Sequence, residues 1–181
     1  MGKFFAGRWQ GAAKSRLAKG PTDFVTELKL AEAQERLRRN LSDILQLHQK
    51  TLPEAETPTE FAAFATIATM ELIVTRSGFP PNRMSLEQRF VVGLFAFLVA
   101  HELGRRTLAD LGVVFAVSAL ELFEKEKIAD VYRLGSSYGR LQQEKRMYRF
   151  LVETIREWFN DPTEAGLEDL VELFRLCCRP N

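Results

Sequence analysis

The sequence has few histidine and cysteine residues, which most metal sites and all disulfide frameworks need. Its 181 residues include two histidines and two cysteines, and the cysteines are adjacent at positions 177 and 178. Neighbouring cysteines seldom bridge each other without strain, so we expect no disulfide framework and a reducing compartment. The run HELGR at 101–105 resembles the start of a zinc motif, but Arg105 stands where the second histidine ligand would be. The sequence therefore predicts no metal site.

Signatures of nucleotide binding and of nucleophilic catalysis are also missing. The chain contains no phosphate-binding glycine loop, no dinucleotide fingerprint and no G-x-S-x-G elbow. The glycine–serine stretch at 135–139 follows no strand pattern, so we interpret it as a turn between helices. The sequence thus favours a protein with no catalytic residues and no cofactor.

Hydrophobic runs are too short to cross a membrane. The longest, residues 90–100, has 11 residues, whereas a span needs about 20. Residues 90–100 and 111–120 are apolar nearly all round, so we expect them to form a buried central pair of helices. No secretory signal is visible. We therefore expect an intracellular protein of the cytoplasm or an organelle matrix, with peripheral association with a membrane left open.

Helix-capping signals recur along the chain. TPTE at 57–60 and SLEQ at 85–88 each place a hydroxyl residue at an N-cap and Glu or Gln three residues later, which is a capping box. We expect Gly78 and Gly104 to end the helices that these motifs begin. TLAD at 107–110, with Thr107 and Asp110, is expected to open the next helix.

Amphipathic patterns surround these apolar helices. They predict a helix over about 23–51, another over 140–160, and a last helix from DPTE at 161–164 to the cysteine pair. The predicted fold is an all-α, single-domain bundle of about six or seven helices, in which two hydrophobic central helices are wrapped by amphipathic ones. We divide the chain into a basic N-terminal arm, 1–21, and a helical domain, 22–181.

The arm is the most asymmetric part of the sequence. Of the 25 basic residues it holds five, whereas all 24 acidic residues lie beyond it, so that the rest of the chain is net negative. Large aromatic side chains dominate protein interfaces, and cations steer a segment to an acidic surface. We expect the arm to bind protein, with the acidic body of this chain and a foreign subunit as equal alternatives. The residues expected to make the contact are Lys3, Phe4, Phe5, Arg8, Trp9, Lys14 and Arg16. RNA or anionic-membrane binding through the arm is an alternative, and it predicts a steep loss of affinity with salt.

Three glutamates, Glu71, Glu102 and Glu121, interrupt apolar helices. If they were buried together, their pKa values would be raised and they could serve as acid or base. The simpler interpretation is that each lies at a helix edge or pairs with a nearby arginine such as Arg105. This leaves open an enzyme with a buried carboxylate site, or a helical bundle that binds a hydrophobic small molecule.

The function we expect is a non-catalytic one. The missing catalytic signatures and the aromatic, basic arm favour an accessory or scaffold subunit that binds other proteins in a larger assembly, through its arm and its outer helix faces. We expect Trp158 and Phe159 to add a second, exposed contact patch.

Overall fold

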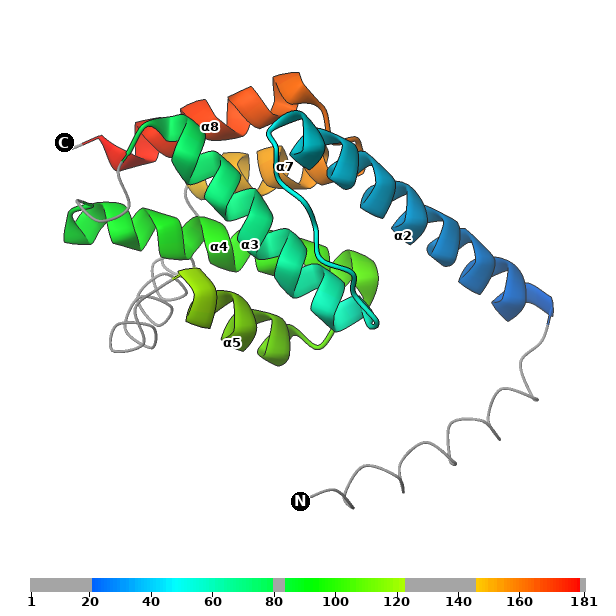
Figure 1. Cartoon of the computed structure of the whole chain (residues 1–181). Helices are drawn as coiled ribbons and strands as arrows, with labels where there is room; N and C mark the ends of the chain where they lie inside the picture. Colours follow the sequence, from blue (N-terminus) through cyan, green and yellow to red (C-terminus); the bar gives the residue numbers. More distant parts are fainter. Residues whose placement is uncertain (1–20, 80–83, 123–145, 180–181) are drawn as a thin grey trace, which may run out of the picture. The chain divides into compact units, whose positions relative to one another are not determined.

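The computed structural model of the chain is all-α (Figure 1). It describes residues 21–79, 84–122 and 146–179, which form six helices and no strand, so the predicted fold class is confirmed. The helices are α2 (Pro21–Leu47), α3 (Pro58–Ser77), α4 (Leu86–Thr107), α5 (Leu111–Leu122), α7 (Arg146–Asn160) and α8 (Glu164–Cys178). The N-terminal arm and the stretch 135–139 lie outside the described residues.

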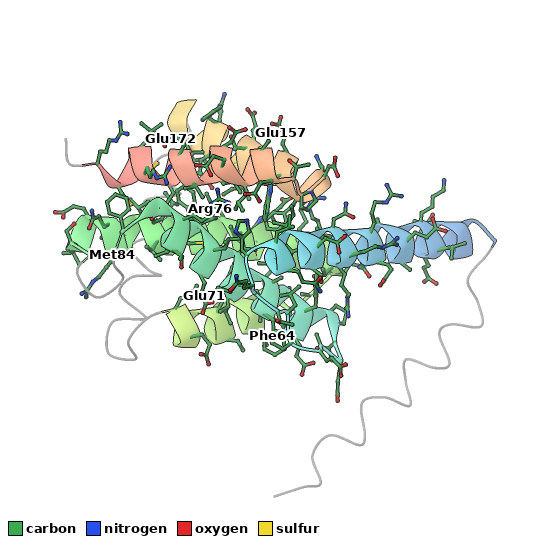
Figure 2. The ribbon with its side chains drawn as sticks, turned by 45° about the horizontal axis from the view of Figure 1, so that its top comes forward. Phe64, Glu71, Arg76, Met84, Glu157 and Glu172 are labelled. Carbon is green, nitrogen blue, oxygen red and sulfur yellow. The ribbon has the colours of Figure 1, made fainter. Side chains whose placement is uncertain are left out.

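The chain divides into two units between Arg36 and Leu37, and the second unit contains the hydrophobic core. The predicted boundary between residues 21 and 22 stays a prediction. Within the second unit, α3 and α4 pack against each other at the centre. Helices α7 and α8 lie on one side of this pair and α5 on the other (Figure 2). The central pair is therefore α3 with α4, and not residues 90–100 with 111–120.

Both predicted capping boxes are present. The Thr57 hydroxyl accepts a hydrogen bond from the Glu60 amide at 3.1 Å, and the Glu60 carboxylate accepts one from the Thr57 amide at 3.2 Å. Ser85 and Gln88 make the same reciprocal pair. Gly78 ends α3 with a φ of 78°, a left-handed conformation that glycine adopts without steric cost. These ends form as predicted because capping depends on neighbours in sequence.

The predicted end of α4 at Gly104 is wrong. The helix continues to Thr107, and Leu108 caps it with φ 56° and ψ 35°. The amides of Leu108 and Ala109 both donate to the carbonyl of Gly104, which is a left-handed C-cap made without glycine. Gly104 serves packing instead, because a Cβ at this position would overlap the side chain of Leu111 at the start of α5.

Of the two residues expected to open α5, only Asp110 does so. Its Oδ1 accepts hydrogen bonds from the amides of Gly112 at 3.0 Å and Val113 at 3.3 Å. The Thr107 hydroxyl is buried and donates back to the Leu103 carbonyl at 2.8 Å, so Thr107 belongs to α4. The helix break is one turn later than the sequence pattern predicts.

The exposed patch predicted at Trp158 and Phe159 is also wrong. Both side chains lie on the core face of α7, where Trp158 is 3% exposed and the two rings meet edge to face at 4.8 Å. The Trp158 indole nitrogen donates to the carbonyl of Thr163, the N-cap of α8. This pair therefore contributes to the join between α7 and α8 rather than to a surface. Helix α8 ends at Cys178, before Pro180, as predicted.

Candidate functional site

Glu102 is a buried carboxylate with two arginine partners on its own helix and a third, Arg156 of α7, at 3.9 Å. It is 4% exposed, and its Oε1 accepts hydrogen bonds from Arg105 at 2.7 Å and Arg106 at 2.8 Å. Arg106 also donates to the Arg156 carbonyl at 3.0 Å and to Asn160 Oδ1 at 2.7 Å. The group therefore ties the end of α4 to α7.

The pKa of Glu102 does not suit a general acid. Burial by itself would raise the pKa of Glu102, but the hydrogen bond from Arg105 and the charges of Arg106 and Arg105 outweigh it. The pKa of Glu102 is therefore lowered, which is the opposite of the shift that a buried general acid needs. The geometry is that of an ion pair that supports the fold.

Glu71 and Glu121 do not join Glu102 in the interior. Both are exposed, and the Glu71 carboxylate accepts a hydrogen bond from Lys50 at 2.8 Å. Glu71 lies on an outward face of α3 and Glu121 at the end of α5, so the alternative of a shared buried carboxylate site does not hold for these two residues, and the simpler interpretation of exposed helix positions does. In the described ranges, no group of three or more His, Cys, Asp or Glu side chains could hold a metal ion.

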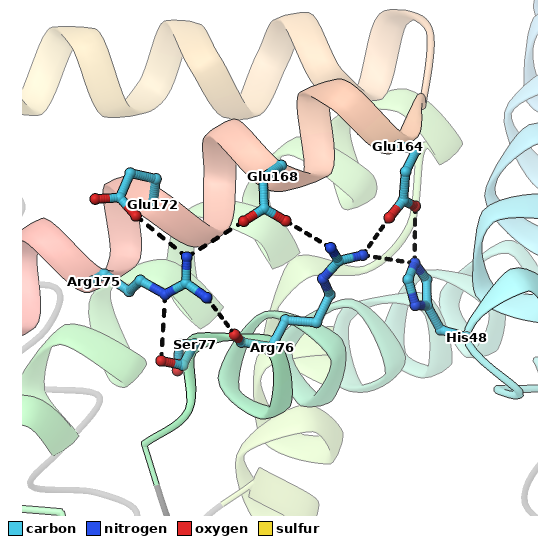
Figure 3. A network of polar contacts seen from close by, with 7 residues as sticks. All are labelled: His48, Arg76, Ser77, Glu164, Glu168, Glu172 and Arg175. Atoms are coloured by element: carbon cyan, nitrogen blue, oxygen red, sulfur yellow. Dashed lines mark hydrogen bonds and ion pairs between the residues drawn. The ribbon is translucent and has the colours of Figure 1, made fainter.

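A second polar network fastens α8 to the end of α3 (Figure 3). Arg76, in the last turn of α3, pairs with Glu164 and lies 2.6 Å from Glu168. The Nε2 atom of His48 lies 2.8 Å from Glu164 and 3.1 Å from Arg76. Arg76 and His48 are half-buried, whereas the two glutamates are nearly half exposed, so solvent screens this network and its effect on stability is modest.

Arg175 of α8 extends the same network by capping α3. Its guanidinium donates to the carbonyl of Arg76 at 2.7 Å and to that of Ser77 at 3.3 Å, which are groups that the end of α3 leaves without helical partners. It also pairs with Glu168 and Glu172. These contacts satisfy charges and backbone groups, and nothing in them indicates catalysis.

We did not predict this network from the sequence, although the sequence contains a signal for it. Glu164, Glu168 and Glu172 recur every four residues and so share one face of a helix. A row of three carboxylates predicts cationic neighbours, and Arg76 is a basic residue in the last turn of α3. Which cations meet the row depends on how α3 packs against α8, and the sequence does not contain that information.

One surface feature of the described residues that folding does not explain is the outer side of α5. Residues 111–117 of this helix include no polar side chain, yet 112, 113 and 116 are exposed. Val113 is 46% exposed, and Leu108, just before the helix, is 71% exposed. A helix that meets water normally places polar residues on its outer face. The predicted burial of residues 111–120 is therefore only half right, because α5 buries its inner side alone.

Leu108 is unfavourable in its backbone as well as in its exposure. Its left-handed conformation costs an L-residue with a Cβ about 1 kcal/mol relative to glycine. An exposed leucine at such a position adds nothing to the core. Because Leu108 is both strained and exposed, we take Leu108 and the outer side of α5 as the candidate site. Its exposed side chains are apolar, which suits the binding of another protein.

The arm residues predicted to bind a partner lie outside the described part of the chain. None of the helices in the described part is both long enough and apolar enough to span a bilayer. Comparisons with protein-family models, with curated proteins and with solved structures find no significant match for this chain. The contacts and exposures described above are therefore the basis for a functional proposal.

Proposed function

We propose that this chain is a non-catalytic helical accessory subunit that binds another protein in a larger assembly, through its basic arm and the outer side of α5. The observation that carries the proposal is the exposed apolar surface of Leu108, Val113 and Ala116, which begins with a leucine in a left-handed conformation. Strained, exposed and apolar positions are retained at binding sites rather than for stability.

The free energy gained by burying these exposed side chains is large enough to contribute to binding. Burying one exposed leucine or valine side chain contributes about 1.5–3 kcal/mol. A few such anchors near the centre of an interface supply most of its binding free energy. The partner we expect offers an apolar surface and a basic group, because the exposed carboxylate of Asp110 lies between Leu108 and Val113 in the chain.

The test is the native mass of the chain in a gentle lysate, compared between matched variants. Leu108→Asn with Val113→Asn removes the apolar surface. Leu47→Asn with Leu176→Asn is the control, because these two residues are 71% and 48% exposed and so match the first pair. We expect wild type and the control to run in an assembly well above 20.7 kDa, and the test pair to run near 20.7 kDa. Deletion of residues 1–20 is expected to release the chain as well.

Unfolding does not account for such a loss. Asparagine adopts the left-handed conformation more readily than leucine, so Leu108→Asn is expected to leave the free energy of unfolding unchanged or raise it by up to about 1 kcal/mol. Urea denaturation measures this. A wild-type chain that runs near 20.7 kDa in the lysate would contradict the proposed function.

A further inference from the structure

Two segments of the chain near the apolar residues Leu108 and Val113 carry acidic residues and no basic one, although Arg105 and Arg106 directly precede the second segment. Residues 51–75 contain four acidic residues and no basic one, and residues 107–122 contain two and none. These two segments meet, because α3 packs against α5. We call the exposed acidic and apolar side chains of α3, of α5 and of the segments just before them the α3–α5 face, and these are Glu54, Glu56, Glu60, Glu71, Leu108, Asp110, Val113, Ala116 and Glu121. Of these, Glu71 pairs with Lys50 at 2.8 Å.

Hydrogen bonds at the start of α3 and α5 place some of these acids near the apolar residues. The amide of Asp110 donates to the Thr59 hydroxyl at 3.1 Å, which joins the start of α5 to the start of α3. Also at the start of α3, the Glu60 carboxylate accepts a hydrogen bond from the Glu56 amide at 2.9 Å. Leu108 is two residues from Asp110 and Val113 is three. The face therefore combines apolar anchors with negative charge.

One segment of this chain has the complementary composition. Residues 1–20 contain five basic residues, no acidic one, and the large aromatic residues Phe4, Phe5 and Trp9. Electrostatic complementarity sets the register and partner of an interface, while aromatic anchors supply much of its affinity. We propose that residues 1–20 of one copy of this chain bind the α3–α5 face of a second copy, and that the exchange is reciprocal.

This inference rests on the proposed function and adds the identity of the partner. Oligomers of identical chains usually close by a two-fold axis, so each arm-to-face contact occurs twice. A stable interface involves about 20–30 residues from each side, and a 20-residue arm with the face that receives it reaches that size in each copy. Reciprocal exchange uses both complementary surfaces and leaves neither exposed.

The experiment measures the mass of the purified full-length chain by light scattering, with charge-reversal variants. The arm variant carries Lys3→Glu, Arg8→Glu and Lys14→Glu. The face variant carries Glu54→Lys, Glu56→Lys and Glu121→Lys. It spares Asp110 and Glu60, because their carboxylates cap helices.

Wild type is expected at twice 20.7 kDa, and each variant alone at 20.7 kDa, because an arm and a face of like charge repel each other. An equal mixture of the two variants is expected to return to twice that mass. In the mixture, the acidic arm meets the basic face and the basic arm meets the acidic face. This rescue requires contact between two copies, so a mixture that stays monomeric overturns the proposal.

A matched control changes three exposed acids on α7 and α8, namely Glu153→Lys, Glu157→Lys and Asp169→Lys. These helices lie on the other side of the α3–α4 pair from α5, and Figure 2 labels Glu157 there. The control is expected to keep the wild-type mass. If it becomes monomeric as well, the effect is one of net charge and the proposal is overturned.

The failure of this inference can be told apart from that of the proposed function. If the purified chain is monomeric while the lysate assembly depends on Leu108 and Val113, the face binds a different protein, and only the second-copy proposal is overturned. If the lysate assembly does not depend on these two residues, the proposed docking surface itself is wrong.

Discussion

Replacing Glu102 with alanine is expected to lower the free energy of unfolding by about 3 kcal/mol, at the lower end of the cost of breaking a buried ion pair. Glu102 is buried and accepts hydrogen bonds from Arg105 and Arg106. Without it, the half-buried Arg106 guanidinium loses its counter-charge, whereas Arg105 is mostly exposed and can turn to water. Urea denaturation at pH 7 measures the loss.

The charge-dependent part of this effect has a predictable pH dependence. The pKa of Glu102 is lowered in the folded protein, so its ionised form contributes stability above the ordinary carboxyl value of 4.5. That contribution is lost as the pH falls through the lowered, folded-state pKa. Glu102→Gln keeps the shape of the side chain and removes the charge, so its destabilisation should be present at pH 7 and should become smaller as the pH falls below 4.5.

The control for Glu102 is a glutamate with a single, exposed partner. Glu71 pairs with Lys50 on the surface, and both side chains are more than a third exposed. Glu71→Ala is expected to change the free energy of unfolding by less than about 1 kcal/mol, because solvent screens the pair. Equal losses for Glu102→Ala and Glu71→Ala would mean that the burial of Glu102 has no energetic consequence, and would contradict this account.

Replacing Gly166 with alanine is expected to lower the free energy of unfolding by about 2 kcal/mol, within the usual cost of overpacking a core. A Cβ at position 166 would lie 2.7 Å from Cδ1 of Trp158. The indole cannot move freely, because it is buried and its nitrogen donates to the Thr163 carbonyl at 3.0 Å. The gain of up to about 1 kcal/mol in helix propensity offsets only part of this cost.

Gly112 provides the matched control for Gly166, since both are glycines in the first turn of a helix. A Cβ at position 112 would meet a single atom, Oδ1 of Asp110, at 3.3 Å. Gly112→Ala is therefore expected to be neutral or stabilising by up to about 1 kcal/mol. Trp158 fluorescence during urea denaturation reports both variants. If Gly166→Ala proves as stable as wild type, the join between α7 and α8 is looser than this packing implies.

The features that depend on neighbours along the chain follow directly from the order of the residues. The capping boxes at 57–60 and 85–88, the end of α3 at Gly78 and the end of α8 before Pro180 all formed as predicted. The pairing of Glu102 with arginines three and four residues away belongs to the same class. In each case the interacting groups lie within one or two helical turns, so local geometry is enough to bring them together.

Other features depend on how the helices pack, and the order of the residues does not predict them. Gly104 looked like a helix end, but it permits the approach of Leu111, and Trp158 looked like a surface anchor, but it packs on Gly166. An apolar stretch shows that a helix has sides suited to burial, but not which sides meet a neighbour. The exposure of the outer side of α5, on which the proposed function rests, depends on the packing of α3 and α4 at the centre of the bundle. It could therefore not be predicted from the sequence.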